Sequence, residues 1–373
     1  MNDFQNRIGD RKIVLAHDWL TGMRGGERVL EVLCQQLPSA KIVALIHDPQ
    51  FISKTINAHE ITCSRLQSIP GIEKSYRYFL PFFPAAVEAV DVPEADLMIS
   101  CSHCVAKGFR AKQNTKHLCY CFTPMRYAWM FYNEYFGKNP LKAMVIKPIL
   151  AWLRSWDRRS ARRVDRFVAI SRNVQKRIKD FYGRDSDVVY PPVDMNRCTP
   201  GKNRKGDFDL VISALVPYKR IDLAVRAYTK LGYPLKVVGN GAEYEKLQSF
   251  AGPNIELLRW LPDNDIVELY RNCRMLIFPG EEDFGIVPLE VQACGAPVVA
   301  YRKGGAMESV TENVSGVFFN EQTVESLLEA VDKCASTTWD PERIRACAGK
   351  FGVENFLSSL ALSVESCLKE ARE

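Results

Sequence analysis

Short apolar runs recur along the chain, and most are followed by a polar turn and a segment with apolar positions at helical spacing. The runs predict buried strands at 12–16, 41–46, 96–100, 117–121, 166–171, 187–190, 209–213, 235–238, 255–258, 274–278 and 297–300. The intervening segments predict helices at 29–36, 173–182, 221–231, 243–250 and 265–273, and a shorter one that starts near 288. Buried strands that alternate with helices are typical of parallel α/β sheets.

Three stretches depart from this alternation. Residues 49–92 have weak periodicity and several Pro, Phe and Tyr residues, and we expect a helix-rich excursion there. Residues 191–206 begin with two prolines and become polar, which indicates a domain boundary. Residues 352–373 predict an amphipathic helix that is long enough to cross from one domain back to the other.

Length and composition are those of a two-domain globular protein. A chain of 373 residues is too long for one ordinary core. We expect one domain at 1–193, joined by the final helix at 353–373, and a second domain at 194–352. A hydrophobic content of 47% with 25% charged residues is typical of soluble proteins.

No apolar run approaches the roughly 20 residues that cross a bilayer, and the polar segment Met1–Asp10 does not resemble a signal peptide. We therefore expect a cytoplasmic protein.

Most of the twelve cysteines lie inside apolar strand or helix patterns. In such places a reduced thiol behaves as a small hydrophobe, so we expect free structural thiols and no disulfide framework. The two close pairs, Cys101 with Cys104 and Cys119 with Cys121, lack a second pair at zinc-finger spacing. A zinc site is only a weak alternative.

Positive charge is concentrated in the first half of the chain. Residues 1–194 carry 29 Lys and Arg against 19 Asp and Glu, a net charge of +10, whereas the remainder carries 21 against 25, a net charge of −4. Residues 138–166 hold nine basic residues and two aspartates among apolar side chains, with Pro148 interrupting the segment. This pattern suits a helix on an anionic membrane surface, and equally a core helix with a solvated basic face. No nucleic-acid recognition motif accompanies the charge, so nucleic acid is not an expected partner.

The loop after the predicted strand 274–278 carries the most informative polar residues. Ligands of parallel α/β sheets bind at the carboxyl ends of the strands. Glu282 lies in this loop, and Glu290 follows eight positions later at the start of a helix. The turn formed by Phe284, Gly285 and Ile286 lets backbone N–H groups approach a ligand. Together these residues predict a clamp for a sugar nucleotide.

Cationic residues follow another strand of the same half. Lys219 and Arg220 stand at a helix start after strand 209–213, where two cations can meet a diphosphate. A solvated pair is the alternative. The glycine-containing exits at 239–241 and 304–305 are expected near the same sheet edge.

Strand ends in the first half supply a second set of candidates. Gly25 and Gly26 lie between a strand and a helix, which is a favourable place for a phosphate because no Cβ blocks its approach. The pattern is not GxGxxG, so it does not favour a dinucleotide-binding fold. The strand-end rule brings further residues to the same cleft. These residues are His17, Asp18, Trp19, His103, Thr123 and Arg126.

Two acid-x-acid triplets resemble the metal clamp of some glycosyltransferases. The triplet at 263–265 follows Pro262 and precedes an amphipathic helix, so a helix cap with acids in the first turn is the favoured interpretation. The triplet at 185–187 lies in a polar turn. We expect no metal site.

The spacing of Glu282 and Glu290, Pro217-x-Lys219 upstream and Gly25-Gly26-Glu27 resemble retaining glycosyltransferases of family 4 over nearly the whole chain. That resemblance implies the GT-B fold: α/β, two facing Rossmann-like domains with a central cleft and a C-terminal helix that crosses back. The resemblance to the bacterial O-antigen and exopolysaccharide mannosyltransferase branch rests on further motifs. They are His17-Asp18-Trp19-Leu20, Thr123-Pro124-Met125-Arg126-Tyr127, Tyr190-Pro191-Pro192-Val193-Asp194 and Leu215-Val216-Pro217-Tyr218-Lys219-Arg220-Ile221-Asp222.

The resemblance also implies roles for the candidate residues. Glu282 contacts the transferred sugar, Glu290 the ribose hydroxyls and Lys219 the diphosphate, and the Gly25-Gly26 loop closes on the diphosphate from the other domain. The expected donor-binding set is Gly25, Gly26, Lys219, Arg220, Glu282, Asp283, Phe284, Gly285, Ile286, Val287 and Glu290. Lys219 and Glu282 are the expected catalytic residues. The first domain is expected to bind the acceptor and the second the nucleotide sugar.

The implied reaction is metal-independent, retaining transfer of a hexose, mannose from GDP-mannose, to an undecaprenyl diphosphate-linked glycan at the inner face of the cytoplasmic membrane. The alternatives are transfer from a UDP-sugar such as UDP-glucose, a GT-B nucleotide-sugar epimerase, and a catalytically silent binding subunit of a polysaccharide-assembly complex. Two departures from the family pattern keep the last alternative open. Ala214 stands where many relatives have arginine, and Phe122 where many have histidine.

Overall fold

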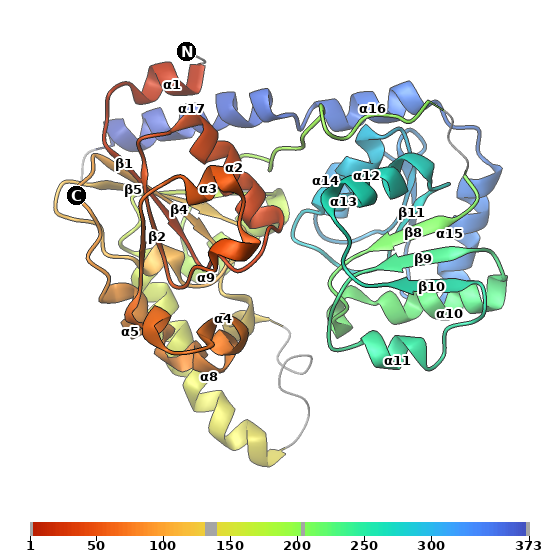
Figure 1. Ribbon diagram of the computed structural model, residues 1–373, viewed down its shortest axis with the longest axis horizontal. Coiled ribbons are helices and arrows are strands. Elements are labelled where there is room, and N and C mark those ends of the chain that lie inside the picture. The colour runs from red at the N-terminus through yellow and green to blue at the C-terminus, as the bar shows by residue number, and fades with distance from the viewer. Residues whose placement is uncertain (1–2, 131–139, 203–205, 371–373) are drawn as a thin grey trace. The chain divides into compact units, whose positions relative to one another are not determined.

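The computed structural model describes residues 3–130, 140–202 and 206–370. The chain divides into two compact units, Met1–Pro191 with Phe356–Glu373, and Pro192–Asn355. Each unit is built on one parallel sheet with helices around it (Figure 1). The two α/β Rossmann-like domains predicted from the apolar runs are therefore confirmed.

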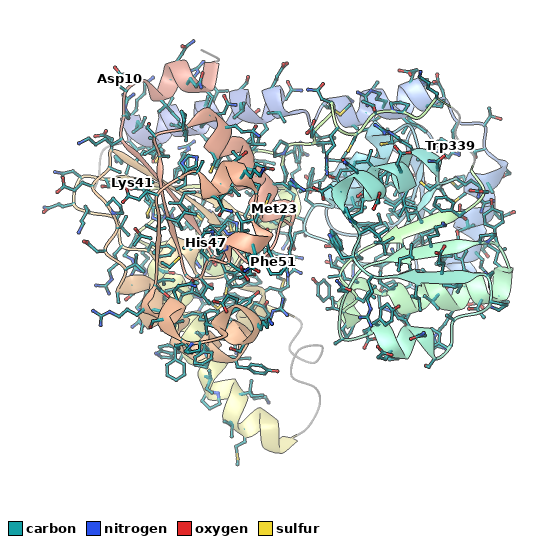
Figure 2. All side chains as sticks on the ribbon, in the orientation of Figure 1. Asp10, Met23, Lys41, His47, Phe51 and Trp339 are labelled. Carbon is teal, nitrogen blue, oxygen red and sulfur yellow. The ribbon has the colours of Figure 1, made fainter. Side chains whose placement is uncertain are left out.

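The sheet of the first unit has the order β3-β2-β1-β4-β5-β6-β7. Its strands are β1 (Ile13–His17), β2 (Lys41–Ala44), β3 (Ile61–Cys63), β4 (Leu97–Ser102), β5 (Lys116–Cys121), β6 (Arg166–Ala169) and β7 (Ser186–Val188). Lys41, which begins β2, is exposed (Figure 2). The excursion at 49–92 is helix-rich, as predicted, but it also contains β3, which was not predicted. At three residues this strand is too short to give an alternating pattern.

The sheet of the second unit has the order β10-β9-β8-β11-β12-β13. Its strands are β8 (Asp209–Ile212), β9 (Leu235–Val238), β10 (Ile255–Leu258), β11 (Leu276–Phe278), β12 (Val298–Tyr301) and β13 (Gly316–Phe319). Strand β8 and the central part of the sheet are buried, which explains why their sequences are continuous apolar runs without alternation.

Helices connect and cover the strands. In the first unit these are α1 (Asp3–Ile8), α2 (Gly25–Gln36), η1 (Pro49–Phe51), α3 (Lys54–Asn57), η2 (Arg65–Ser68), α4 (Ile72–Ser75), η3 (Tyr76–Phe82), α5 (Phe83–Glu88), η4 (Ala106–Gly108), α6 (Arg126–Trp129), α8 (Pro140–Ala161) and α9 (Arg172–Tyr182). In the second they are η5 (Pro217–Lys219), α10 (Ile221–Leu231), α11 (Tyr244–Gln248), α12 (Asp263–Asn272), α13 (Ile286–Ala293), α14 (Ala306–Ser309), α15 (Val324–Ser336) and α16 (Pro341–Gly349). Helix α17 (Val353–Lys369) returns to the first unit, as predicted.

Local sequence signals explain several helix ends. Ser171 caps α9, since its Oγ accepts a hydrogen bond from the backbone N–H of Val174 at 3.1 Å. Helix α12 begins at Asp263 with Pro262 as its N-cap, so the prediction that an aspartate caps this helix was wrong. The predicted first-turn acids are confirmed, since Asp263 and Asp265 lie in the first turn, where their charges complement the helix dipole.

The basic segment at 138–166 is largely one helix. Pro148 lies inside α8 and does not interrupt it, contrary to the prediction. Leu150, Leu153 and Trp156 are buried in the core cluster of the first unit, which confirms core packing for this part of the helix. The start of the segment, residues 138–139, lies outside the described residues.

Burial also accounts for the cysteines. All twelve are free, and most are buried, as predicted. Burial raises the pKa of Cys34 to about 12, so this thiol stays protonated and unreactive at neutral pH. Among the described helices, none is both long and apolar enough to span a lipid bilayer.

The strand order creates one reversal point in each sheet. In the first sheet β1 lies beside β4, and in the second β8 lies beside β11, so the connections leave in opposite directions on either side of each pair. A crevice forms at the carboxyl ends of such neighbouring strands. The two reversal points therefore position the candidate residues.

Candidate active site

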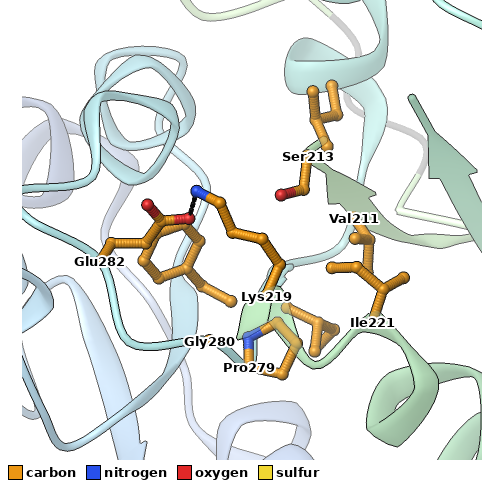
Figure 3. Close-up of a pocket in the computed structure, with 10 residues that line it drawn as sticks. Val211, Ser213, Lys219, Ile221, Pro279, Gly280 and Glu282 are labelled. Atoms are coloured by element: carbon orange, nitrogen blue, oxygen red, sulfur yellow. Dashed lines mark hydrogen bonds and ion pairs between the residues drawn. The ribbon is translucent and has the colours of Figure 1, made fainter. Parts of the chain in front are cut away.

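Lys219 and Glu282 meet at the reversal point of the second sheet. Lys219 ends η5 after β8, and Glu282 lies in the loop after β11. The Lys219 ammonium forms an ion pair with the Glu282 carboxylate (Figure 3). Their side chains are only 14% and 13% exposed. The pair lines a pocket together with Val211, Ser213, Ile221, Pro279 and Gly280. The structure thus joins two residues that are 63 positions apart in the chain.

Glycines allow the loops around this pair to approach closely. A Cβ on Gly280 would lie 2.7 Å from the carbonyl oxygen of Lys219, and one on Gly305 would lie 2.2 Å from the Cα of Phe284. The backbone N–H of Gly305 donates to the carbonyl oxygen of Glu282 at 2.8 Å. A larger residue at either position would push the loop that carries Glu282 out of place. The predicted proximity of the 304–305 exit is therefore observed.

The remaining loop residues lead into α13. Asp283 and Phe284 are buried, and the Phe284 ring packs against Phe351 with centroids 5.6 Å apart. Gly285 is the N-cap of α13, and Ile286 and Val287 are its first residues. The first N–H groups of a helix have no partner within the helix and carry a partial positive charge. Such a helix start can hold an anion, and it follows directly on the loop that carries Glu282.

Arg220 is placed differently from its neighbour. It has a left-handed backbone with φ of 53° and is the N-cap of α10. Its Nε donates to Asp222 at 3.1 Å, so part of its charge is compensated within the helix start. The two cations predicted to act together therefore have different environments.

Glu290 is held by two residues that the sequence did not indicate. Arg197 forms an ion pair with the Glu290 carboxylate, and the Tyr270 hydroxyl donates to it at 2.8 Å. Burial and the neighbouring Glu290 charge raise the pKa of Tyr270, so the phenol stays protonated as a donor. Arg197 lies 93 positions from Glu290, and no local pattern connects them.

At the reversal point of the first sheet, Asp18 organises the turn after β4. Its carboxylate accepts hydrogen bonds from the backbone N–H groups of four consecutive residues, 103–106. The His103 Nδ1 lies 2.8 Å from Asp18 Oδ2. Burial would raise the pKa of Asp18, but His103 and the hydrogen bonds outweigh burial and hold it well below its usual range. Asp18 is thus an ionised anchor for the loop that carries His103.

His17, Trp19 and His103 gather around this anchor. The His17 Nδ1–H donates to the carbonyl oxygen of Trp19 at 2.9 Å, and the rings of Trp19 and His103 meet edge to face at 4.5 Å. Burial lowers the pKa of His17, so its imidazole is neutral at pH 7. The Phe122 ring lies 6.4 Å from both histidine rings. These predicted cleft residues are therefore neighbours.

The glycine pair lies beside the same cluster but not in a loop. Gly25 and Gly26 are the first residues of α2, four positions earlier than the predicted helix start, so the prediction of a glycine loop was wrong. A Cβ on Gly26 would lie 3.3 Å from His17 Nε2. The Arg24 N–H donates to the buried Glu27 carboxylate at 3.1 Å, and this capping box starts the helix early.

Thr123 and Arg126 follow β5. Thr123 is buried, and the Arg177 guanidinium of α9 donates to its hydroxyl at 3.5 Å. Arg126 is the first residue of α6 and is partly exposed.

The acid-x-acid triplets have other partners. Asp185 pairs with Lys179 at 2.7 Å, and Asp187 pairs with Arg166 at 2.7 Å. Within the ranges that the structure describes, no group of three or more His, Cys, Asp or Glu side chains is arranged to hold a metal ion.

Two family models match consecutive parts of the chain. The model described as Glycosyltransferase Family 4 matches residues 23–197, and the model described as Glycosyl transferases group 1 matches residues 195–349. The first match contains the Gly25-Gly26 pair, and the second contains Lys219, Glu282 and Glu290.

Curated relatives cover part of the chain. An uncharacterized glycosyltransferase of Methanocaldococcus jannaschii is 27% identical over 216 residues, which are 56% of this chain and 58% of the relative. A D-inositol 3-phosphate glycosyltransferase of Geodermatophilus obscurus is 31% identical over 240 residues, 55% of this chain and 53% of the relative. The chain thus spans little more than half the length of these relatives.

Solved structures share the fold over nearly the full length of the chain. The Anabaena protein HepE in complex with UDP-glucose superposes with a TM-score of 0.66 at 17% identity, covering 95% of this chain and 99% of that one. At this identity the similarity concerns the fold. Together with the two sheets, it confirms the predicted GT-B fold.

Proposed function

We propose that this chain is a GT-B glycosyltransferase, a retaining hexosyltransferase that takes its sugar from a nucleoside-diphosphate donor. The observation that carries the proposal is the Lys219–Glu282 pair at the reversal point of the second sheet, beside the N-terminus of α13. A cation, a carboxylate and free helix N–H groups at one sheet edge suit a ligand with both phosphates and hydroxyls.

Each group has a distinct task in this proposal. The Lys219 ammonium and the first N–H groups of α13 bind the diphosphate, and Arg220 adds positive charge nearby. The Glu282 carboxylate orients the ammonium and accepts hydrogen bonds from hydroxyls of the transferred sugar. Glu290 accepts from the ribose hydroxyls. Arg197 and Tyr270 fix its carboxylate.

Transfer then depends on stabilising the leaving group. The bond between the anomeric carbon and the phosphate oxygen breaks, and negative charge develops on the diphosphate beside Lys219. The acceptor hydroxyl oxygen forms its bond to the anomeric carbon on the same face, and its proton passes to the departing phosphate oxygen. Same-face attack retains the anomeric configuration without a protein nucleophile. The products are the extended glycan and the nucleoside diphosphate.

For the substrates, we propose GDP-mannose as donor and a glycan linked to undecaprenyl diphosphate as acceptor. Synthesis of a bacterial surface polysaccharide would then take place at the cytoplasmic face of the membrane. The motifs around His17, Thr123 and Lys219 favour this assignment. A UDP-sugar donor is the second candidate, because the similar Anabaena protein binds UDP-glucose. A silent binding subunit is the third, because Ala214 and Phe122 depart from the family pattern.

A thermal-shift panel tests the donor. GDP-mannose is expected to raise the melting temperature of the chain by several degrees, since a ligand at about 100 times its Kd adds about 2.7 kcal/mol of stability. UDP-glucose, UDP-galactose, GDP and UDP are run in parallel, and the linkage of the product is determined with the best donor. A larger shift with UDP-glucose would select the second candidate. Donor binding without transfer to lipid-linked acceptors would select the silent subunit.

Chelation of divalent cations is expected to leave transfer within about twofold of its untreated rate, because lysine and helix N–H groups neutralise the diphosphate in this mechanism. Initial rates are compared in EDTA, in EDTA followed by excess Mg²⁺ or Mn²⁺, and in untreated enzyme. A loss of activity that either cation restores would show that a metal ion takes part.

A further inference from the structure

Large apolar side chains are exposed at one end of the first unit. Met144, Val145 and Trp152 lie on α8, and Tyr78 and Phe82 lie on η3. Their exposed fractions are 73%, 62%, 46%, 87% and 62%, respectively. The first turns of α8 extend beyond α4 and α5 (Figure 1). We call the exposed side of α8 between residues 144 and 152 the outer face.

The inner side of the same helix already has its partner. Ile146 and Ile149 are partly buried against the core that contains Leu150 and Leu153. Because a helix turns about 100° per residue, Val145 and Trp152 lie on the flank of this buried side, whereas Met144 lies on the side away from the core. Exposed apolar side chains therefore continue beyond the buried side, where a helix at the surface of a soluble domain is usually polar. Packing against the core therefore does not explain why the outer face carries large apolar side chains.

The second exposed segment belongs to the same end of the unit. Trp156 of α8 donates to Glu88 of α5 at 2.8 Å, and η3 runs directly into α5. Phe79 and Leu80 of η3 pack inward against the same core, whereas Tyr78 and Phe82 remain outside. Two neighbouring elements thus each present an aromatic or aliphatic surface to solvent.

The charges beside the apolar residues are positive. Lys147 lies within the outer face. Arg158 and Arg159 in the last turn of α8, and Arg162 just after the helix, are also exposed. The only acid in α8 is Asp157, which is fully buried. Lys74 of α4 and Arg77 of η3 are exposed, and the partly exposed Glu73 lies beside Lys74. The surface therefore combines large apolar side chains with cations and has no exposed carboxylate on α8.

This combination favours an anionic lipid surface over a protein. Apolar side chains that insert into the headgroup region, next to cations worth about 1 kcal/mol each, are the features of an interfacial helix. Trp prefers this interface. A second copy of the chain would bring these cations face to face, which opposes self-association through this surface.

We propose that the outer face of α8, assisted by Tyr78 and Phe82, docks the first unit on the surface of an anionic bilayer, with Met144, Val145 and Trp152 inserted among the lipid headgroups. The helix lies on the membrane and does not cross it. This proposal needs neither the donor nor transfer, so it stands or fails separately from the proposed function.

Sedimentation with vesicles of phosphatidylcholine, with and without phosphatidylglycerol, tests the proposal on the full chain. The wild type is expected to bind the vesicles that contain phosphatidylglycerol, and to release them at high salt. Replacing Met144, Val145 and Trp152 together with serine is expected to lower the partition coefficient about tenfold or more, because the inserted apolar area is lost. Replacing Tyr78 and Phe82 is expected to give a smaller loss.

A matched control carries serine at Trp260, Met307 and Leu362, which are exposed by 48%, 56% and 55% at other places on the surface. The control is expected to bind vesicles like the wild type, and melting curves and the donor-induced shift confirm that every variant is folded. The proposal would be overturned if the wild type does not bind anionic vesicles, or if the partition coefficient falls equally in the α8 variant and in the control. Dimers or complexes with an acidic protein that vanish only in the α8 variant, without vesicle binding, would identify a protein partner instead.

Discussion

Replacing Lys219 or Glu282 with alanine is expected to lower the turnover number about tenfold or more while the fold survives. In the proposed mechanism the Lys219 ammonium faces the departing diphosphate as it becomes more negative, so its loss affects the transition state more than the ground state. Loss of Glu282 removes the ion pair with the ammonium and, in the same mechanism, the contacts to the sugar. Initial rates with saturating donor, beside donor Kd values, separate these effects.

The matched control for Lys219 is Lys230→Ala. Lys230 is an exposed lysine of the same unit, at the end of α10, and it makes only a distant ion pair with Glu325 at 3.7 Å. Its replacement is expected to leave turnover unchanged. The double variant Lys219→Ala with Glu282→Ala is expected to lower the turnover number by a smaller factor than the product of the factors for the two single variants. The reason is that the two side chains interact with each other. Near-normal transfer in both single variants would refute the assignment of the active site.

The sequence predicted this pair because both residues follow buried strands of a parallel sheet. Strands β8 and β11 are continuous apolar runs, and the strand-end rule alone places Lys219 and Glu282 at one edge. The same rule brought His17 and Asp18 to His103 in the first unit. Where a candidate residue is positioned by the backbone of a strand, its place follows from the fold and needs no knowledge of side-chain contacts.

Features that depend on tertiary contacts were not predictable in this way. Arg197 reaches Glu290 from the segment before β8 at the start of the second unit, and Tyr270 reaches it from α12. An arginine in a polar linker and a tyrosine on an amphipathic helix have many equivalent explanations in a sequence. The early start of α2 depends on the capping box of Arg24 and Glu27, whereas helix propensity argues against two glycines in a first turn.

A buried ion pair in the first unit leads to the second large expected effect. Replacing Lys107 with methionine is expected to lower the free energy of unfolding of this unit by about 3–5 kcal/mol, because it leaves the Asp157 carboxyl group buried without its ion-pair partner. Both side chains are almost fully buried. Burial lowers the pKa of Lys107, but Asp157 outweighs burial and raises it, so the lysine is charged in the folded chain. Urea unfolding followed by circular dichroism measures the loss.

A neutral version of the pair separates charge from packing. The double variant Lys107→Met with Asp157→Asn has no buried charge, and its amide oxygen can still accept from Trp129 Nε1 and Tyr182 Oη, which lie 2.7 and 2.8 Å from the carboxylate. Its free energy of unfolding is therefore expected to be about 1–3 kcal/mol higher than the value obtained by adding the losses of the two single variants. The same double replacement of the exposed pair Lys176 and Asp180 should change stability by about 0.5 kcal/mol or less.

This test also bears on the turns that carry the cleft residues. Lys107 belongs to η4, directly after the loop that Asp18 anchors, and Trp129 ends α6, which follows Thr123. Asp157 thus ties both turns to α8 and α9 through three hydrogen-bonded partners. If Lys107→Met costs less than about 1 kcal/mol, the pair does not hold these turns, and their positions depend on Asp18 and the apolar core alone.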